Sequence, residues 1–148
     1  MNVEEIIKTN QQMPLAKRTL IHIALVANKI DEEIAAVLKP FDVSIQQFNV
    51  LRILRGQNNK PANLSTINER MVTKMSNTTR LVDKLILKGY VNRNVCLKNR
   101  RKVEIVITED GLNVLKKIDG ILFEAEKRIL KNFMEKELHE FNKLLNKF

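Results

Sequence analysis

The chain has 148 residues and a formal net charge of +9, from 26 Lys and Arg against 17 Asp and Glu. This length suits one compact domain and is too short for two large ones. No apolar run approaches the roughly 18 residues of a membrane span, and the acidic N-terminus is unlike a secretory signal. The single cysteine, Cys96, cannot pair within the chain, which suits a reducing compartment. These features predict a cytoplasmic protein.

The positive charge is concentrated in the middle of the chain. Residues 60–110 contain eleven Lys or Arg and five Asp or Glu, so about a third of the sequence holds +6 of the net charge of +9. A basic patch raises the local concentration of polyanions and speeds their association. A solubilising surface would have the same composition, so charge alone leaves both interpretations open.

The N-terminal part is predicted to be helical. Apolar residues recur in steps of three and four over residues 16–38, which indicates a long amphipathic helix. Pro40 is expected to end it, because the residue before a proline disfavours the helical conformation. Ser44 is a typical N-cap for a second helix, which closes at Gly56.

The central part is predicted to change from helix to strand. Two short helices and then two short strands are expected, over residues 64–71, 74–88, 90–95 and 103–108. Gly89 is a suitable C′ residue for the second of these helices. The strands are joined by residues 96–102, a polar and strongly basic hairpin tip.

The C-terminal part is predicted to be helical again from Glu109 onward. Its apolar residues alternate at steps of three and four, at Leu115, Ile118, Leu122, Ala125, Ile129 and Phe133. This pattern is suited to packing against a partner helix. A final helix carries Leu138, Phe141, Leu144, Leu145 and Phe148.

The order helix, helix, strand, basic hairpin, strand predicts a mainly α (α+β) winged helix-turn-helix fold. In such a fold the second short helix, 74–88, enters a major groove, where base edges are readable. Its first turns are polar and its apolar residues begin at Leu81, which is the distribution that groove insertion requires. The DNA-binding candidates on it are Lys74, Ser76, Asn77, Thr78, Thr79, Arg80 and Lys84. The competing interpretation is that these are capping residues of an ordinary surface helix.

The hairpin tip adds a second DNA-binding candidate. Lys98, Arg100, Arg101 and Lys102 place four cations within five residues, and their mutual repulsion would be relieved by a polyanion. A slender basic loop suits the minor groove, whose negative potential attracts arginine. Basic hairpin tips also occur as solvated surface, so the combination of helix and hairpin in this order is the stronger signal.

Residues 79–85, 88–91, 99–101 and 106–111 together resemble the MarR family of bacterial regulators, and the resemblance extends over nearly the whole chain. It implies a winged-helix homodimer that represses transcription at a pseudo-palindromic operator and is relieved by a small phenolic or anionic molecule or by oxidation. It also implies one MarR-type domain over 1–148, with a DNA-binding lobe at 42–110, a recognition helix at about 74–88, a wing at about 96–102, and dimerisation helices at 1–39 and 111–148.

The resemblance assigns a role to the hairpin tip. The family's wing pattern Asp-x-Arg falls on Asn99, Arg100 and Arg101, so Arg101 would be the arginine inserted into the groove. Asn99 stands in place of the acid; an asparagine accepts a hydrogen bond but forms no ion pair with Arg101.

Parts of the sequence are also compatible with two other functions. A redox-responsive regulator of the same fold would act through Cys96, whose thiolate the nearby cations would favour, although the chain has no second cysteine to resolve a sulfenic acid. A helical interaction module, or a basic surface that binds membrane, would use the C-terminal helices, but acids interspersed among their lysines weaken attraction to anionic lipid.

The sequence does not predict an enzyme, a cofactor or a metal. It has four glycines, no P-loop and no dinucleotide-binding fingerprint. His22 and His139 do not stand in a metal-ligand spacing, and a structural or exposed role is expected for both.

Overall fold

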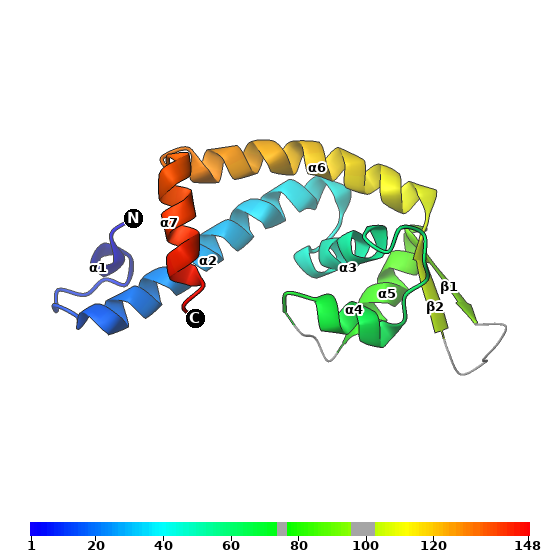
Figure 1. The fold of residues 1–148 in the computed structure, drawn as a ribbon, viewed down its shortest axis with the longest axis horizontal. Helices are drawn as coiled ribbons and strands as arrows, with labels where there is room; N and C mark the ends of the chain where they lie inside the picture. Colours follow the sequence, from blue (N-terminus) through cyan, green and yellow to red (C-terminus); the bar gives the residue numbers. More distant parts are fainter. Residues whose placement is uncertain (74–76, 96–102) are drawn as a thin grey trace.

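The computed structural model describes residues 1–73, 77–95 and 103–148. The described chain is mainly helical, with a small antiparallel sheet at one end, as predicted (Figure 1). The long helices α2 and α6 lie side by side, and three shorter helices gather with the sheet into a lobe. The elements in chain order are α1 (Val3–Ile6), α2 (Leu15–Leu38), η1 (Lys39–Phe41), α3 (Ile45–Arg55), α4 (Leu64–Arg70), α5 (Thr78–Leu87), β1 (Val91–Val95), β2 (Val103–Ile107), α6 (Glu109–Leu130) and α7 (Glu135–Leu145). Within the described residues, no helix combines the length and apolar character that crossing a membrane requires.

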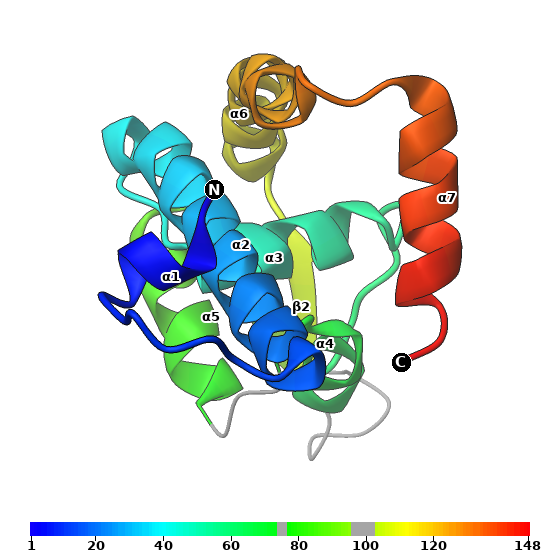
Figure 2. The ribbon, with the colours of Figure 1, turned by 90° about the vertical axis from the view of Figure 1, so that its left-hand side faces the viewer.

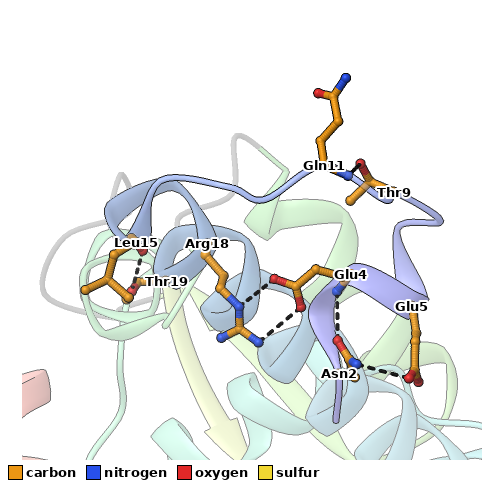
Figure 3. Close-up of polar contacts among 8 residues, drawn as sticks. All are labelled: Asn2, Glu4, Glu5, Thr9, Gln11, Leu15, Arg18 and Thr19. Carbon is orange, nitrogen blue, oxygen red and sulfur yellow. Dashed lines mark hydrogen bonds and ion pairs between the residues drawn. The ribbon is translucent and has the colours of Figure 1, made fainter.

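The short helix α1 packs against α2 and is joined to it by an ion pair. Val3 is fully buried, and the Arg18 guanidinium donates to both carboxylate oxygens of Glu4, at 2.7 and 3.2 Å (Figure 3). This hydrogen bond with Arg18 lowers the pKa of Glu4. The side chain of Asn2 caps α1 by accepting from the Glu4 backbone N–H at 3.1 Å.

The turn from α2 to α3 follows the predicted signals. α2 ends at Leu38, and Pro40 lies in the single 3-10 turn that follows. Ser44 is the N-cap of α3, as predicted: its hydroxyl accepts from the Gln47 backbone N–H at 3.2 Å. The Gln47 side chain accepts in return from the Ser44 N–H at 3.0 Å, which completes a capping box.

The lobe has an apolar core to which every one of its elements contributes. Leu51 of α3, Ile67 of α4, Val82 and Leu85 of α5, and Ile105 of β2 are all fully buried. Burial of a residue of this size stabilises the folded state by roughly 1.5–3 kcal/mol. The core therefore holds α4 and α5 in fixed positions against α3 and the sheet.

One residue outside the two strands also pairs with the sheet of the lobe. β1 and β2 pair antiparallel with Val91 opposite Ile107, and both strands begin and end within one residue of the predicted bounds. Ahead of α4, Ala62 exchanges two backbone hydrogen bonds with Ile105, at 2.9 and 2.8 Å. This bridge was not predicted, because a single paired residue leaves no periodic pattern in the sequence.

The apolar stripe of α6 closes the core of its own chain. Leu115, Ile118, Leu122 and Ala125 are buried where α6 packs against α2 and α3. Phe133, just beyond the helix, is 47% exposed. Most of the stripe therefore packs against helices α2 and α3 of the same chain, and the use of this region in a dimer stays a prediction.

A compact polar junction joins the end of the α5 segment to the start of α6. Thr108, the N-cap of α6, donates its hydroxyl to the Gly89 carbonyl at 2.7 Å and accepts from the Gly111 N–H at 3.1 Å. The Thr108 N–H donates to the Tyr90 carbonyl at 3.0 Å. Gly89 has a φ of 73°, the left-handed conformation expected of a C′ glycine. Gly111 must lack a side chain, because a Cβ there would lie 2.3 Å from the Tyr90 oxygen.

Replacing Gly111 with alanine is therefore expected to lower the free energy of unfolding by about 1–3 kcal/mol, the usual cost of overpacking. Gly120→Ala is the matched control in the same helix, since a Cβ at Gly120 meets no described atom within 4 Å. That variant should leave stability unchanged or raise it by up to about 1 kcal/mol. Urea unfolding followed by circular dichroism measures both; equal stability of the two variants would contradict the close approach at Gly111.

Candidate nucleic-acid interface

A buried polar contact joins α4 and α5, the helix-turn-helix pair of the lobe. Thr78 is the first residue of α5 and is only 6% exposed. Its hydroxyl donates to Oδ1 of Asn68 on α4 at 3.1 Å. Thr78, one of the predicted DNA contacts, thus lies enclosed between the two helices, and its role in DNA contact stays a prediction. A buried hydroxyl requires a partner of this kind.

The side chains of α5 divide into an inward apolar face and an outward polar face. Val82 and Leu85 are buried in the core, with Leu81 packed against it. The exposed residues among the predicted DNA contacts are Asn77, Thr79, Arg80 and Lys84. Neither Arg80 nor Lys84 forms an ion pair with another described residue. Their charges are therefore available to an external anion.

α5 begins four residues later than predicted, at Thr78 instead of Lys74, and residues 74–76 lie outside the described residues. The predicted contacts outside the described residues are Lys74, Ser76, Lys98, Asn99, Arg100 and Arg101. Cys96 also lies outside them.

An ion pair that sequence reasoning missed joins α5 to the hairpin. Nη1 of Arg93 on β1 lies 2.7 Å from Oδ1 of Asp83 on α5, and the two side chains are 30% and 49% exposed. Such exposed pairs contribute at most about 1 kcal/mol to stability. The pair matters more for position, because it links the strand that leads to the hairpin tip with the helix beside it. The residues lie on different elements, so no local spacing in the sequence indicates it.

A second ion pair connects the end of α5 to the turn before α3. The Lys88 ammonium donates to the carboxylate and to the backbone carbonyl of Asp42. The hydrogen bond with Lys88 holds the pKa of Asp42 below its usual value. Asp42 has a φ of 51°, a left-handed conformation that Asp tolerates better than most residues.

The described residues contain no cluster of three His, Cys, Asp or Glu side chains that could hold a metal ion. His22 is partly buried on α2. His139 on α7 is exposed, with its Nε2 3.8 Å from a Glu135 oxygen.

The lobe combines two helices joined by a buried polar contact, a polar outer face on the second helix and an antiparallel hairpin beside it. This arrangement defines a winged helix-turn-helix, the class of fold that can present a helix to the major groove of DNA.

Comparisons with known proteins agree with this class. Residues 43–103 match the model of the MarR family. The HTH-type transcriptional regulator YfiV of Bacillus subtilis (strain 168) is 36% identical over 94 residues, which cover 64% of this chain and 55% of that protein. The HTH-type transcriptional repressor IacR of Pseudomonas putida is 24% identical over 123 residues, covering 83% of this chain and 72% of that protein.

A solved structure supports the fold of the whole chain. The organohalide-sensing transcriptional regulator RdhR, in its 2,4-dichlorophenol-bound form, matches with a TM-score of 0.83 at 19% identity, over 92% of this chain and 80% of that one. Residues 43–103 are therefore similar to the MarR family, and most of the chain shares its fold with a solved transcriptional regulator. The chain spans about half the length of YfiV and nearly three quarters of IacR.

Thr78→Val is expected to lower the free energy of unfolding by about 1–3 kcal/mol, because it leaves the Asn68 amide oxygen without this donor in a buried contact. Thr78→Ser keeps the hydroxyl and should lose less. Thr79→Ala, at the exposed neighbouring position, is the control and should change stability by no more than about 0.5 kcal/mol. Thermal unfolding of the three variants tests the assignment, which fails if Thr78→Val is as stable as Thr79→Ala.

Proposed function

We propose that this protein is a sequence-specific DNA-binding transcriptional regulator that represses its target genes as a homodimer. The observation that carries the proposal is the exposed polar face of α5, backed by buried Val82 and Leu85. A recognition helix needs this division, because one face must be anchored while the other offers hydrogen-bonding groups to base edges. The relatives named as a transcriptional regulator and a transcriptional repressor support the biological role.

The proposed major-groove contacts come from the first turns of α5. Asn77 is suited to the paired donor and acceptor of adenine, and Arg80 to the two acceptors of guanine. Thr79 adds a hydroxyl, and Lys84, one turn beyond Arg80, is suited to a phosphate. Lys74 and Ser76 remain in the proposal as contacts at the start of the same segment.

The proposed minor-groove contact is the hairpin between β1 and β2. Arg101 would reach into the groove, assisted by Arg100, with Lys98 and Asn99 beside them. The ion pair between Asp83 and Arg93 supports the joint use of helix and hairpin, because it connects the strand leading to the hairpin with α5.

The proposed dimer interface is the apolar surface of the C-terminal helices, with α1 and the start of α2. α7 stands apart from α2 and α6 (Figure 2), and none of its residues is buried by the described chain. The exposed apolar side chains here include Phe133, Phe141, Leu144 and Leu145, which are 47%, 43%, 49% and 40% exposed. The Phe133 and Phe141 rings stack at 6.4 Å and form one continuous patch. Such a patch marks an interaction surface, and regulators of the MarR family act as dimers.

In this proposal residues 42–110 form the DNA-binding lobe and residues 1–39 and 111–148 the dimerisation helices. Two-fold symmetry would place two copies of α5 in successive major grooves of a pseudo-palindromic operator, about 10 bp apart. A small phenolic or anionic effector would release the operator by binding the DNA-incompetent spacing of the lobes more tightly. The phenol in the RdhR structure supports this class of effector.

The proposal is tested by titrating the purified chain into the duplex upstream of its own gene and into a scrambled duplex of equal length, across a salt series. We expect a preference for the upstream duplex of about 10³-fold or more at physiological salt. Weak binding that is equal for both duplexes and lost as salt rises would reduce the function to a basic surface.

Three variants distinguish residues that read base identity from residues that strengthen binding to every sequence. Asn77→Ala is expected to relax the preference at one base pair, at a cost of about 1–3 kcal/mol in binding, whereas Arg101→Ala should weaken binding to all sequences. Lys29→Ala, an exposed cation on α2 outside the proposed DNA-binding lobe, is the control and should bind as the unmodified chain does. If Asn77→Ala loses the same affinity for every operator sequence, Asn77 does not read a base.

The dimer is tested by introducing a charge into the apolar patch. Phe141→Asp is expected to shift the chain from dimer to monomer in sedimentation experiments, because a carboxylate cannot be buried unpaired in an apolar interface. Asn142→Asp adds the same charge at the next, also exposed, position and should remain dimeric. If Phe141→Asp remains a dimer, the interface does not include this apolar patch.

A further inference from the structure

The buried stripe of α5 begins with a polar residue. Thr78, Val82 and Leu85 follow one another at steps of four and three, and all three are turned inward. Val82 and Leu85 belong to the apolar core, whereas the Thr78 hydroxyl donates to Oδ1 of Asn68 on α4. A valine in this place would continue the apolar stripe with nearly the same shape. Burial alone therefore does not account for the hydroxyl.

The start of α5 is held differently from the starts of its neighbours. Asn77 occupies the N-cap position, but its side chain makes no capping hydrogen bond to the described first turn. The N-caps of α3, α4 and α6, whose side chains do accept such a bond, are Ser44, Asn63 and Thr108. The Asn77 side chain is exposed and is not used to close its helix. The contact between Thr78 and Asn68 thus takes the place of a cap in holding the first turn.

The direction of Thr78 also sets the directions of its neighbours. Successive residues lie about 100° apart around a helix, so Arg80 points about 200° away from Thr78, to the side opposite α4. Thr79 and Arg80 are both exposed there. Apolar contact is not directional, whereas a hydrogen bond weakens steeply when its atoms are misaligned. The polar pair therefore restricts rotation of the first turn, on which the bidentate fit of an arginine to a base depends.

We propose that Asn68 and Thr78 are positioning residues that determine base specificity. Their hydrogen bond fixes the rotation of the first turn of α5, and so they act on the bases through Asn77 and Arg80. The inference rests on the proposed function, in which α5 reads the major groove. It adds Asn68, a residue of α4 that is not among the proposed contacts. Loss of the pair reduces discrimination between sequences more than total affinity, because phosphate contacts carry no sequence information.

The test is the double variant Asn68→Leu with Thr78→Val, which removes both partners and keeps their approximate shapes. Such a paired apolar replacement is close to neutral for stability. Anisotropy titrations compare the operator with operators changed at the base pairs that Asn77→Ala and Arg80→Ala identify. We expect the discrimination there, normally about 5- to 150-fold per mismatch, to fall to about threefold. Affinity for a scrambled duplex and its salt dependence should stay unchanged, because the phosphate contacts remain.

Three further variants separate specificity from stability. Thr78→Ser keeps the hydroxyl and should keep the full discrimination. Ser65→Ala is the matched control, because it removes an exposed hydrogen bond within α4, to Glu69 at 3.0 Å, and should leave discrimination unchanged. Asn68→Ala removes only the acceptor at a partly buried position and should lose discrimination even if the double variant does not fold. A folded double variant that discriminates as sharply as the unmodified chain would overturn the proposal.

Hydrogen exchange followed by NMR tests the positioning without DNA. The Leu81 N–H donates to the Asn77 carbonyl at 3.3 Å in the first turn, and the Lys88 N–H donates to the Lys84 carbonyl at 3.2 Å at the other end of α5. In the double variant the Leu81 amide should exchange about two- to tenfold faster, while the Lys88 amide keeps its rate. An unchanged rate at Leu81 contradicts the proposal. If the unmodified chain shows no operator preference, the proposed function fails, and exchange at Leu81 still decides whether the pair positions α5.

Discussion

The hydrogen bonds of Thr108 are the constraint on which the arrangement of the molecule depends. One side chain both caps α6 and binds the carbonyl at the end of the α5 segment, so it joins the start of the long helix directly to the lobe, against which α6 also packs through α3. Gly111 allows this approach because any Cβ would strike the Tyr90 carbonyl. Hydrogen bonds are directional, whereas apolar burial is not. The junction therefore sets an orientation that the core alone would leave loosely defined.

Apolar burial and directional polar contacts also act together along α5. Its apolar face supplies the burial, and polar contacts at its start, middle and end set its position. Thr78 binds α4, Asp83 binds β1 and Lys88 binds the turn before α3. Only the first of these is buried, and a buried polar contact costs most when broken. The contact of Thr78 with Asn68 thus holds the start of α5, where the proposed base-reading residues are, against α4.

The C-terminal helices show the limit of what one chain can bury. α6 uses its inner stripe to cover α2 and α3, and α7 has no comparable surface within the described chain, so Phe141 and its neighbours remain exposed. Periodicity alone could not separate these two cases, because it identifies an apolar face and not what covers it. The α6 stripe finds its partner helices within the same chain, while several apolar side chains of α7 stay exposed.

The sequence by itself determined most of the elements and their order, because caps, glycines and periodicity act over a few residues; the short helix α1 was not predicted. Ser44, Gly89 and the two strands are the clearest instances. Only the tertiary structure decided that Thr78 faces Asn68 instead of solvent, that Asp83 pairs with Arg93, and that Lys88 pairs with Asp42. These contacts join residues on different elements, whose distances depend on how the core packs and are not encoded in local spacing.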